Sequence, residues 1–229
     1  MALINEFNER VNDINAYFDI LLFEDAVEAY KNKPITNTDQ GQQLFVNNTM
    51  QKCMRANAII MLYNLVESTF CNCVQQIYDA IRDEHLTYNV VSHKLRKIWI
   101  DLAFDPQWHI DAVRHHAKDI SDNLQSAVLS YAEMPAGTSG NLDFAKMVEI
   151  SGKFDINFGN VPNIDDVKTT LSYLKKNRND LAHGNTTFSY VGANVSLTEL
   201  IGHKNHTIAF LQHCIGVYDQ YVQHKVYRI

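Results

Sequence analysis

The stretch from Ala58 to Val74 is apolar nearly all the way around a helix, and this constrains the fold more than any other feature of the sequence. A helix that is apolar on all sides has to be covered by other elements. Only four prolines and nine glycines occur in 229 residues, which leaves room for long helices on both sides of this stretch. The sequence therefore predicts an all-α protein with this segment at the centre of a helical bundle.

Helical periodicity continues before and after this segment. A first helix is expected from about residue 3 to 31, and a second from about 40 to 85. A third is expected at 89–104, and Pro106 opens a fourth. The apolar side chains of the first helix recur at alternating steps of three and four: Ile4, Phe7, Val11, Ile14, Phe18 and Leu21.

Residues 133–162 lack this regularity. Pro135 opens a loop, residues 143–151 fit a short helix, and residues 154–158 fit an extended piece. We expect an insertion packed on the bundle rather than a linker, because four apolar side chains in this part need burial: Phe144, Met147, Val148 and Ile150.

Two further helices are expected in residues 163–225. Asn163 can cap the first of them, and Gly184 can end it in the left-handed conformation. Residues 185–194 suggest a β-turn or small hairpin, and Ser196-Leu197-Thr198-Glu199 is a capping box that starts the last helix. The expected result is one domain of about five to seven helices. It divides into an N-terminal helix (1–38), central helices (40–132), the irregular insertion (133–162), and the motif helix with the last helix (163–225).

Charge and cysteine content narrow the class of protein. A net charge of −6 argues against a sequence-blind binder of duplex nucleic acid. The four cysteines form no paired CxxC framework, which disfavours a disulfide scaffold or a zinc ribbon. Met1-Ala2-Leu3-Ile4 leads straight into charged residues, so no secretory signal is expected. No apolar run approaches the roughly 18 residues of a membrane span. We therefore expect a cytoplasmic protein with no membrane partner.

The stretch Arg178-Asn179-Asp180-Leu181-Ala182-His183, followed by Gly184, is the part of the sequence that points to chemistry. The imidazole of His183 can act as general base toward a ribose 2′-hydroxyl, since the pKa of histidine lies near neutrality. Arg178 can stabilise charge on the phosphoryl oxygens, and Asn179 can orient the imidazole or hold a phosphate. These groups are what RNA cleavage requires without a metal or another cofactor, because the nucleophile belongs to the substrate.

The spacing favours a site built from two copies of the chain. Asn179 and His183 are four residues apart and share a helix face, whereas Arg178 lies roughly 140 degrees around the helix from His183. A homodimer would bring two imidazoles and two guanidiniums to one cleft, where the second histidine could protonate the leaving 5′-oxygen. Lys175 and Lys176 are expected to contact RNA there. The alternative is a solvated helix face whose C-terminal histidine is favoured by the helix dipole.

Other groups of side chains are less suited to chemistry. His203, His206 and His213 have a loosely ligand-like spacing, but apart from Cys214 no further ligand nearby in sequence completes a zinc site. His115 and His116 are adjacent on an expected helix and point apart, so an exposed helix face is the simpler interpretation. The sequence has no Walker loop, GxGxxG or GxSxG motif.

The order of these features resembles HEPN domains. The segment Arg-Asn-Asp-Leu-Ala-His-Gly on the penultimate long helix resembles the RxxxxH motif of that superfamily. More narrowly, the chain looks like the RiboL-PSP-HEPN or MAE-type branch. The segment from Ala58 to Ser68 resembles an earlier core helix that ends in an acid, here Glu67, and Ser139-Gly140-Asn141-Leu142-Asp143 resembles a segment before the motif helix, together with Phe154-Asp155-Ile156. The resemblance covers roughly residues 40–225.

This resemblance implies a metal-independent endoribonuclease that cleaves single-stranded RNA or tRNA and acts as a homodimer. Such proteins are commonly toxins of toxin–antitoxin systems or phage-defence effectors, which implies an antitoxin or defence-system partner protein. Arg178 and His183 carry over as catalytic positions, and Asn179 matches the polar residue that often follows the arginine. Glu67 matches the acid, which is either catalytic or pairs with Arg178. Some HEPN proteins only bind nucleotides or partners, so a non-catalytic binding module is the alternative.

Overall fold

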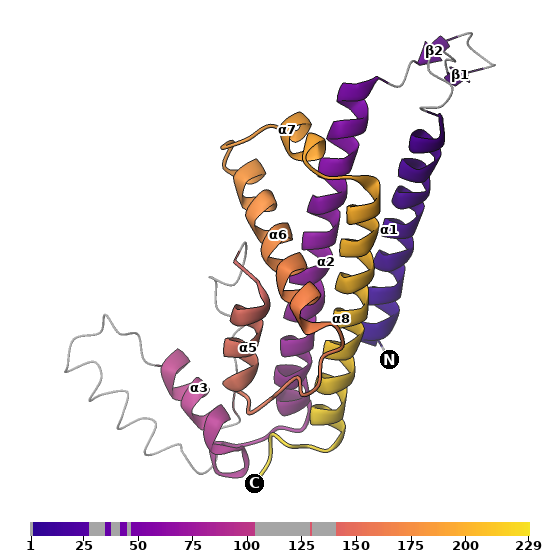
Figure 1. Cartoon of the computed structure of the whole chain (residues 1–229). Helices are drawn as coiled ribbons and strands as arrows, with labels where there is room; N and C mark the ends of the chain where they lie inside the picture. The colour runs from indigo at the N-terminus through magenta and orange to yellow at the C-terminus, as the bar shows by residue number, and fades with distance from the viewer. Residues whose placement is uncertain (1, 28–34, 38–41, 45–46, 104–128, 130–140) are drawn as a thin grey trace.

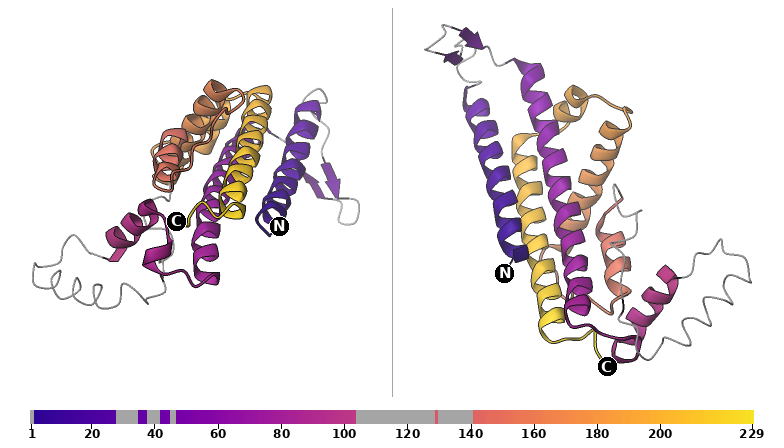
Figure 2. Two further views of the ribbon diagram at one scale, coloured as in Figure 1. Left: turned by 90° about the horizontal axis from the view of Figure 1, so that it is seen from below. Right: turned by 180° about the vertical axis from the view of Figure 1, so that it is seen from behind.

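The computed structural model describes residues 2–27, 35–37, 42–44, 47–103, 129 and 141–229. Four long helices form its main body: α1 (Ala2–Val27), α2 (Asn48–Asp83), α6 (Ile164–Ala182) and α8 (Leu197–Gln223). They run alternately up and down (Figure 1). α2 and α8 lie side by side at the centre, with α1 on one side of this pair and α6 on the other (Figures 1 and 2). The prediction of an all-α helical bundle is confirmed.

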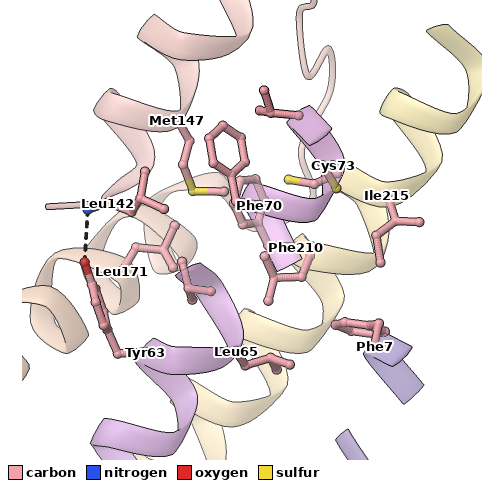
Figure 3. Packing of buried hydrophobic residues seen from close by; sticks show 14 of the residues in the cluster. Phe7, Tyr63, Leu65, Phe70, Cys73, Leu142, Met147, Leu171, Phe210 and Ile215 are labelled. Carbon is pink, nitrogen blue, oxygen red and sulfur yellow. Dashed lines mark hydrogen bonds between the residues drawn. The ribbon is translucent and has the colours of Figure 1, made fainter. Parts of the chain in front are cut away.

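The apolar segment of α2 is buried as predicted. Its inward positions between Ala56 and Ile81 are at most 4% exposed. Figure 3 shows them packed against α8, which contributes Phe210 and Ile215, and near Phe7 of α1. Burying a large apolar side chain stabilises a fold by roughly 1.5–3 kcal/mol. This one helix therefore organises much of the core, and the helices around it bury their own apolar faces on it.

The remaining elements in the described part of the chain are shorter. They are the strands β1 (Ile35–Asn37) and β2 (Gln42–Leu44), a 3₁₀-helix (Tyr88–Val90), and the helices α3 (His93–Ala103), α5 (Phe144–Gly152) and α7 (Phe188–Ala193). β1 and β2 pair antiparallel, with Thr36 opposite Gln43. With α3, α5 and α7 added to the four long helices, the described residues form seven α-helices.

The second helix was expected from about residue 40, and this start is wrong. Residues 42–44 form the strand β2 instead, and α2 begins at Asn48. The physical reason is a cap: the side chain of Asn47 accepts a hydrogen bond from the N–H of Met50 at 2.9 Å, which satisfies a donor of the first turn.

The third helix also starts later than expected. Residues 88–90 form the 3₁₀-helix, and α3 begins at His93 rather than at 89. Arg96 holds the irregular connection by donating to Val91 O at 3.1 Å and to Asn89 O at 2.8 Å. The end of the first expected helix, residues 28–31, and the helix expected from Pro106 lie outside the described residues.

The insertion contains the predicted short helix, α5, and packs on the bundle through Met147 and Ile150, which are buried. Val148 was expected to be buried and is 45% exposed, because it lies about 100 degrees around the helix from Met147. The expected extended piece at 154–158 forms no strand: the N–H of Ile156 bonds to Ser151 O at 3.0 Å and closes the end of α5. The single-domain organisation stays a prediction.

A β-turn or small hairpin was expected between residues 185 and 194, and the hairpin is wrong, because residues 188–193 form the helix α7 (Phe188–Ala193). Thr187 caps it by accepting a hydrogen bond from the N–H of Tyr190 at 3.2 Å. Gly192 lies directly on α2: a Cβ added there would sit 1.7 Å from the carbonyl oxygen of Lys52. The close packing of this helix on α2 is therefore a tertiary contact, which local pattern does not reveal.

The ends of α6 and α8 mostly follow prediction. Asn163 stands at the start of α6, but it has a φ of 51° and its side chain caps nothing, which corrects the expected cap. Asp165 and Asp166 lie in the first turn, where the helix dipole favours anions. The capping box of Ser196 and Glu199 is confirmed at the start of α8.

Candidate functional site

The C-terminal end of α6 presents His183 to solvent. His183 is the C-cap residue, with a φ of −90°, and Gly184 follows with a φ of +71°. The N–H of Gly184 bonds to Leu181 O at 3.2 Å and that of Asn185 to Asp180 O at 2.9 Å, which is a Schellman ending. The His183 side chain is exposed, and no hydrogen bond or ion pair of the described residues engages its imidazole. The ring is therefore accessible to a substrate.

Arg178 is held between α6 and α2. Its Nη2 lies 3.3 Å from Oε2 of Glu67, and its Nη1 donates to Oδ1 of Asn179 at 3.0 Å. The side chains of Arg178 and Glu67 are 23% and 17% exposed. A guanidinium has five N–H donors, and these two bonds leave others unused by the described residues. The arginine is thus fixed in place and still able to bind an anion.

The ring of Tyr63 contacts the guanidinium of Arg178, and sequence reasoning did not identify this residue as part of the site. The Arg178 Cζ lies 5.1 Å from the centroid of the tyrosine ring, over its face. Burial, reinforced by the nearby Glu67 carboxylate, raises the pKa of Tyr63 to about 12. The signal that could have identified it is its spacing, because Tyr63 and Glu67 are four residues apart on one helix and share a face.

The two lysines expected to contact RNA lie in different settings. Lys175 forms an ion pair with Asp143, the N-cap residue of α5, and both side chains are partly buried. Burial raises the pKa of Asp143, but the hydrogen bond from the Lys175 ammonium and bonds from backbone N–H groups lower it below its usual value. Lys176 is exposed and lies 3.5 Å from Asp180. Lys176 is therefore the more accessible of the two cations, and contact of either with RNA stays a prediction.

The structure brings Glu67, Arg178 and Asn179 into one cluster, with His183 at the end of the same helix. No hydrogen bond within the described part of the chain joins the imidazole to Arg178. That one copy supplies a base and a cation on different sides of a helix stays a prediction. The geometry offers a proton acceptor, a fixed cation and an amide, which together suit a phosphodiester substrate.

Of the other histidines considered in the sequence, His203, His206 and His213 serve packing, whereas His115 and His116 lie outside the described residues. The Oγ1 of Thr170 lies 3.0 Å from Nδ1 of His203 and 3.4 Å from Nδ1 of His206, and the His203 ring stacks on Tyr173. Burial lowers the pKa of His203. His213 bonds through Nε2 to the Phe158 carbonyl oxygen at 2.6 Å. Among the described residues, no three His, Cys, Asp or Glu side chains are arranged to hold a metal ion.

The fold and this end of α6 define a class of protein. An all-α bundle whose penultimate long helix ends in Arg178 and His183, with Glu67 of the central helix against the arginine, is a HEPN-type protein. The chain belongs to the MAE_28990-like HEPN family, whose family model matches residues 1–227. No curated protein and no solved structure matches the chain.

Membership in this family carries a general expectation. HEPN domains are often ribonucleases, and they often bind RNA and dimerise. No helix in the part of the chain that the structure describes has the length and apolarity needed to cross a lipid bilayer.

Proposed function

We propose that this protein is a metal-independent endoribonuclease that cleaves single-stranded RNA or tRNA, as a toxin or a phage-defence effector. The observation that carries the proposal is the placement of Arg178, fixed by Glu67 with donors to spare, on the helix that ends in the exposed His183. A cation that is fixed before substrate arrives costs little reorganisation during the reaction.

The proposed reaction is an internal transesterification. His183 accepts the proton of a ribose 2′-hydroxyl, and the 2′-oxygen attacks the adjacent phosphorus. The bond from phosphorus to the 5′-oxygen breaks, and a protonated imidazole donates its proton to that oxygen. The products are a 2′,3′-cyclic phosphate and a 5′-hydroxyl. Arg178 stabilises the charge on the phosphoryl oxygens with its planar fork of donors.

The second imidazole comes, in this proposal, from a second copy of the chain. One chain places only one exposed histidine at the end of α6, and Arg178 lies on another side of that helix. A self-complementary dimer through this end would put two histidines and two arginines in one groove. Asn179, bonded to Arg178, helps to orient the guanidinium, and Lys176 adds a salt-dependent contact to the RNA backbone.

The direct test is cleavage of single-stranded RNAs and tRNAs in EDTA, with analysis of the product ends. We expect cyclic phosphate ends from the wild type and a rate about 100- to 10,000-fold lower from His183→Ala, since general base catalysis is worth that much. His224→Ala is a matched control, because His224 is the C-cap residue of α8 and is also exposed. Full activity of His183→Ala would remove this residue from the mechanism.

A second measurement separates the two functions that the family allows. Wild-type protein that dimerises but cleaves none of a broad set of RNAs would favour the non-catalytic binding module. For the biological role, we expect induced expression to slow growth of the host cell, and Arg178→Ala to relieve this. A co-expressed antitoxin or defence-system partner protein should also relieve it.

A further inference from the structure

Tyr63 stands between the candidate site and the core. Its ring is fully buried, and the guanidinium of Arg178 lies over the ring face, with Cζ 5.1 Å from the centroid. A guanidinium stacks well on an aromatic face, because the face carries a partial negative charge. The Glu67 carboxylate approaches the guanidinium through Nη2. Ring and carboxylate together therefore hold the position of the arginine head group.

The hydroxyl of the same tyrosine accepts a hydrogen bond from the N–H of Leu142 at 3.0 Å (Figure 3). Leu142 precedes the N-cap residue of α5, Asp143, whose Oδ1 accepts from the N–H of Lys146 at 2.9 Å. Asp143 also pairs with Lys175 of α6. The start of α5 is thus tied to α2 by one bond and to α6 by another, and these two helices carry Glu67 and Arg178.

We propose that Tyr63 is a positioning residue for Arg178, and that its hydroxyl couples the position of the arginine to the start of α5. The effect on cleavage rests on the proposed ribonuclease function, whereas the placement of the guanidinium does not. A small displacement of a group that stabilises the reacting phosphate can lower the rate about 100-fold. α5 would then influence the reaction without touching the substrate.

Tyr218 shows what an ordinary buried tyrosine does in the same core. It is also fully buried, and its hydroxyl also bonds to α5, 2.8 Å from Oγ of Ser151. Its ring meets the edge of Phe70 rather than a cation. Tyr218→Phe therefore also removes a buried hydrogen bond to α5 but leaves the support of Arg178 unchanged, which makes it the matched control.

The test compares Tyr63→Leu, Tyr63→Phe and Tyr218→Phe by two readouts. The first is the NMR signal of the Arg178 guanidinium, assigned through Arg178→Lys, because a ring face displaces the signals of protons that lie over it. The second is RNA cleavage at single turnover with saturating RNA, together with KM. We expect Tyr63→Leu to lose the ring-induced displacement and to cleave about 10- to 100-fold more slowly with little change in KM.

Tyr63→Phe keeps the ring and removes only the hydroxyl that accepts the hydrogen bond from Leu142. This milder variant still tests the proposal if Tyr63→Leu does not fold. We expect its Leu142 amide to exchange with solvent at least about tenfold faster, and its Arg178 signal to shift away from the wild-type position. Tyr218→Phe should leave the Arg178 signal and the cleavage rate unchanged. An Arg178 signal that is unchanged in the folded Tyr63 variants, or equally changed by Tyr218→Phe, would overturn the proposal.

The two proposals fail separately. If the wild-type protein cleaves no RNA, the ribonuclease proposal fails, while the guanidinium signal and the Leu142 amide still decide whether Tyr63 positions Arg178. If the wild type cleaves RNA and the Tyr63 variants cleave equally well with an unchanged Arg178 signal, only the positioning role is lost.

Discussion

Arg178 and Glu67 are 111 positions apart in the sequence and meet as an ion pair, with Nη2 of the arginine 3.3 Å from Oε2 of the glutamate. Their side chains are 23% and 17% exposed, so the pair lies neither in the core nor free in solvent. It joins α6 to the central helix. Removal of one partner should therefore cost more than it does in a surface pair, because the other charge is left partly buried without its partner.

Removal of the Glu67 side chain should lower the stability of the fold. We expect Glu67→Ala to lower the free energy of unfolding by about 1–2 kcal/mol, because a partly buried guanidinium loses its carboxylate partner. Urea unfolding measures this. Lys176→Ala, which breaks the exposed pair with Asp180 on the same helix, is the control and should change stability by less than about 0.5 kcal/mol. Equal effects of the two substitutions would contradict a structural role for the Glu67 pair.

Gly184 should tolerate no side chain without strain. Its φ of +71° is unfavourable for residues with a Cβ, although a Cβ there would meet nothing within 4 Å. We expect Gly184→Ala to destabilise the protein by about 1 kcal/mol and to lower cleavage, because the Schellman ending places His183. Gly202→Ala, inside α8 and also in open space, should instead stabilise by about 0.5–1 kcal/mol. The expectation fails if both substitutions shift the unfolding midpoint in the same direction.

Gly192 should be more sensitive still. An added Cβ would lie 1.7 Å from the carbonyl oxygen of Lys52, so α7 would have to move away from α2. We expect Gly192→Ala to destabilise by about 3 kcal/mol or more, measured by thermal unfolding. Hydrogen exchange should show that α7 opens first. Gly216→Ala has nothing within 4 Å and controls for the added methyl group. A loss below about 0.5 kcal/mol would show that α7 does not rest on α2 in this way.

Protonation of Glu84 at acid pH should weaken the attachment of the C-terminal residues to the end of α2. The Glu84 carboxylate accepts from Lys225 Nζ at 2.8 Å, from the Tyr227 hydroxyl at 3.0 Å and from Arg228. The bond from Lys225, reinforced by Arg228 and Tyr227, lowers the pKa of Glu84 from 4.5 to about 2. A carboxyl with a lowered pKa stabilises the fold above its unfolded pKa, and this contribution is lost as pH falls toward the folded one.

The pH window is therefore between about 4.5 and 2. We expect the stability difference between wild type and Glu84→Gln to be constant above pH 4.5 and to shrink below it, as followed by urea unfolding. The amide of Ile229, which donates to Val90 O at 3.0 Å, should exchange faster over the same range. A stability difference that does not depend on pH would contradict the assigned role of Glu84.

Much of the fold was predictable because it follows from local pattern. The steps of three and four that place Phe7, Ile14 and Phe18 on one face of the first helix are a property of the chain itself, and all three are buried. The capping box of Ser196 and Glu199 and the glycine ending at Gly184 are equally local, and both are present. The resemblance to the HEPN branch rests on the same ordered pattern, and the family match confirms it.

Other features depend on contacts between elements, and sequence reasoning missed them. The segment around Gly192 contains β-favouring residues, but it forms the helix α7, and the missing side chain of Gly192 lets this helix lie against Lys52. Val148 is apolar and exposed, because α5 meets the bundle through the side that carries Met147, and local pattern does not reveal which side that is. In the sequence, Tyr63 is indistinguishable from other aromatic residues of the core, and only the tertiary structure places the guanidinium of Arg178 over its ring.

By itself, the sequence determined which segments form long helices, where α6 ends, and that Arg178 and His183 lie near that end, because helix periods and caps act within a few residues. Only the tertiary structure decided that Glu67 and Tyr63 hold the arginine and that Asp143 engages Lys175. These contacts join helices that are far apart in the chain. The burial of apolar faces brings the helices together, but the hydrophobic effect is non-directional, so local pattern does not specify which polar side chains meet.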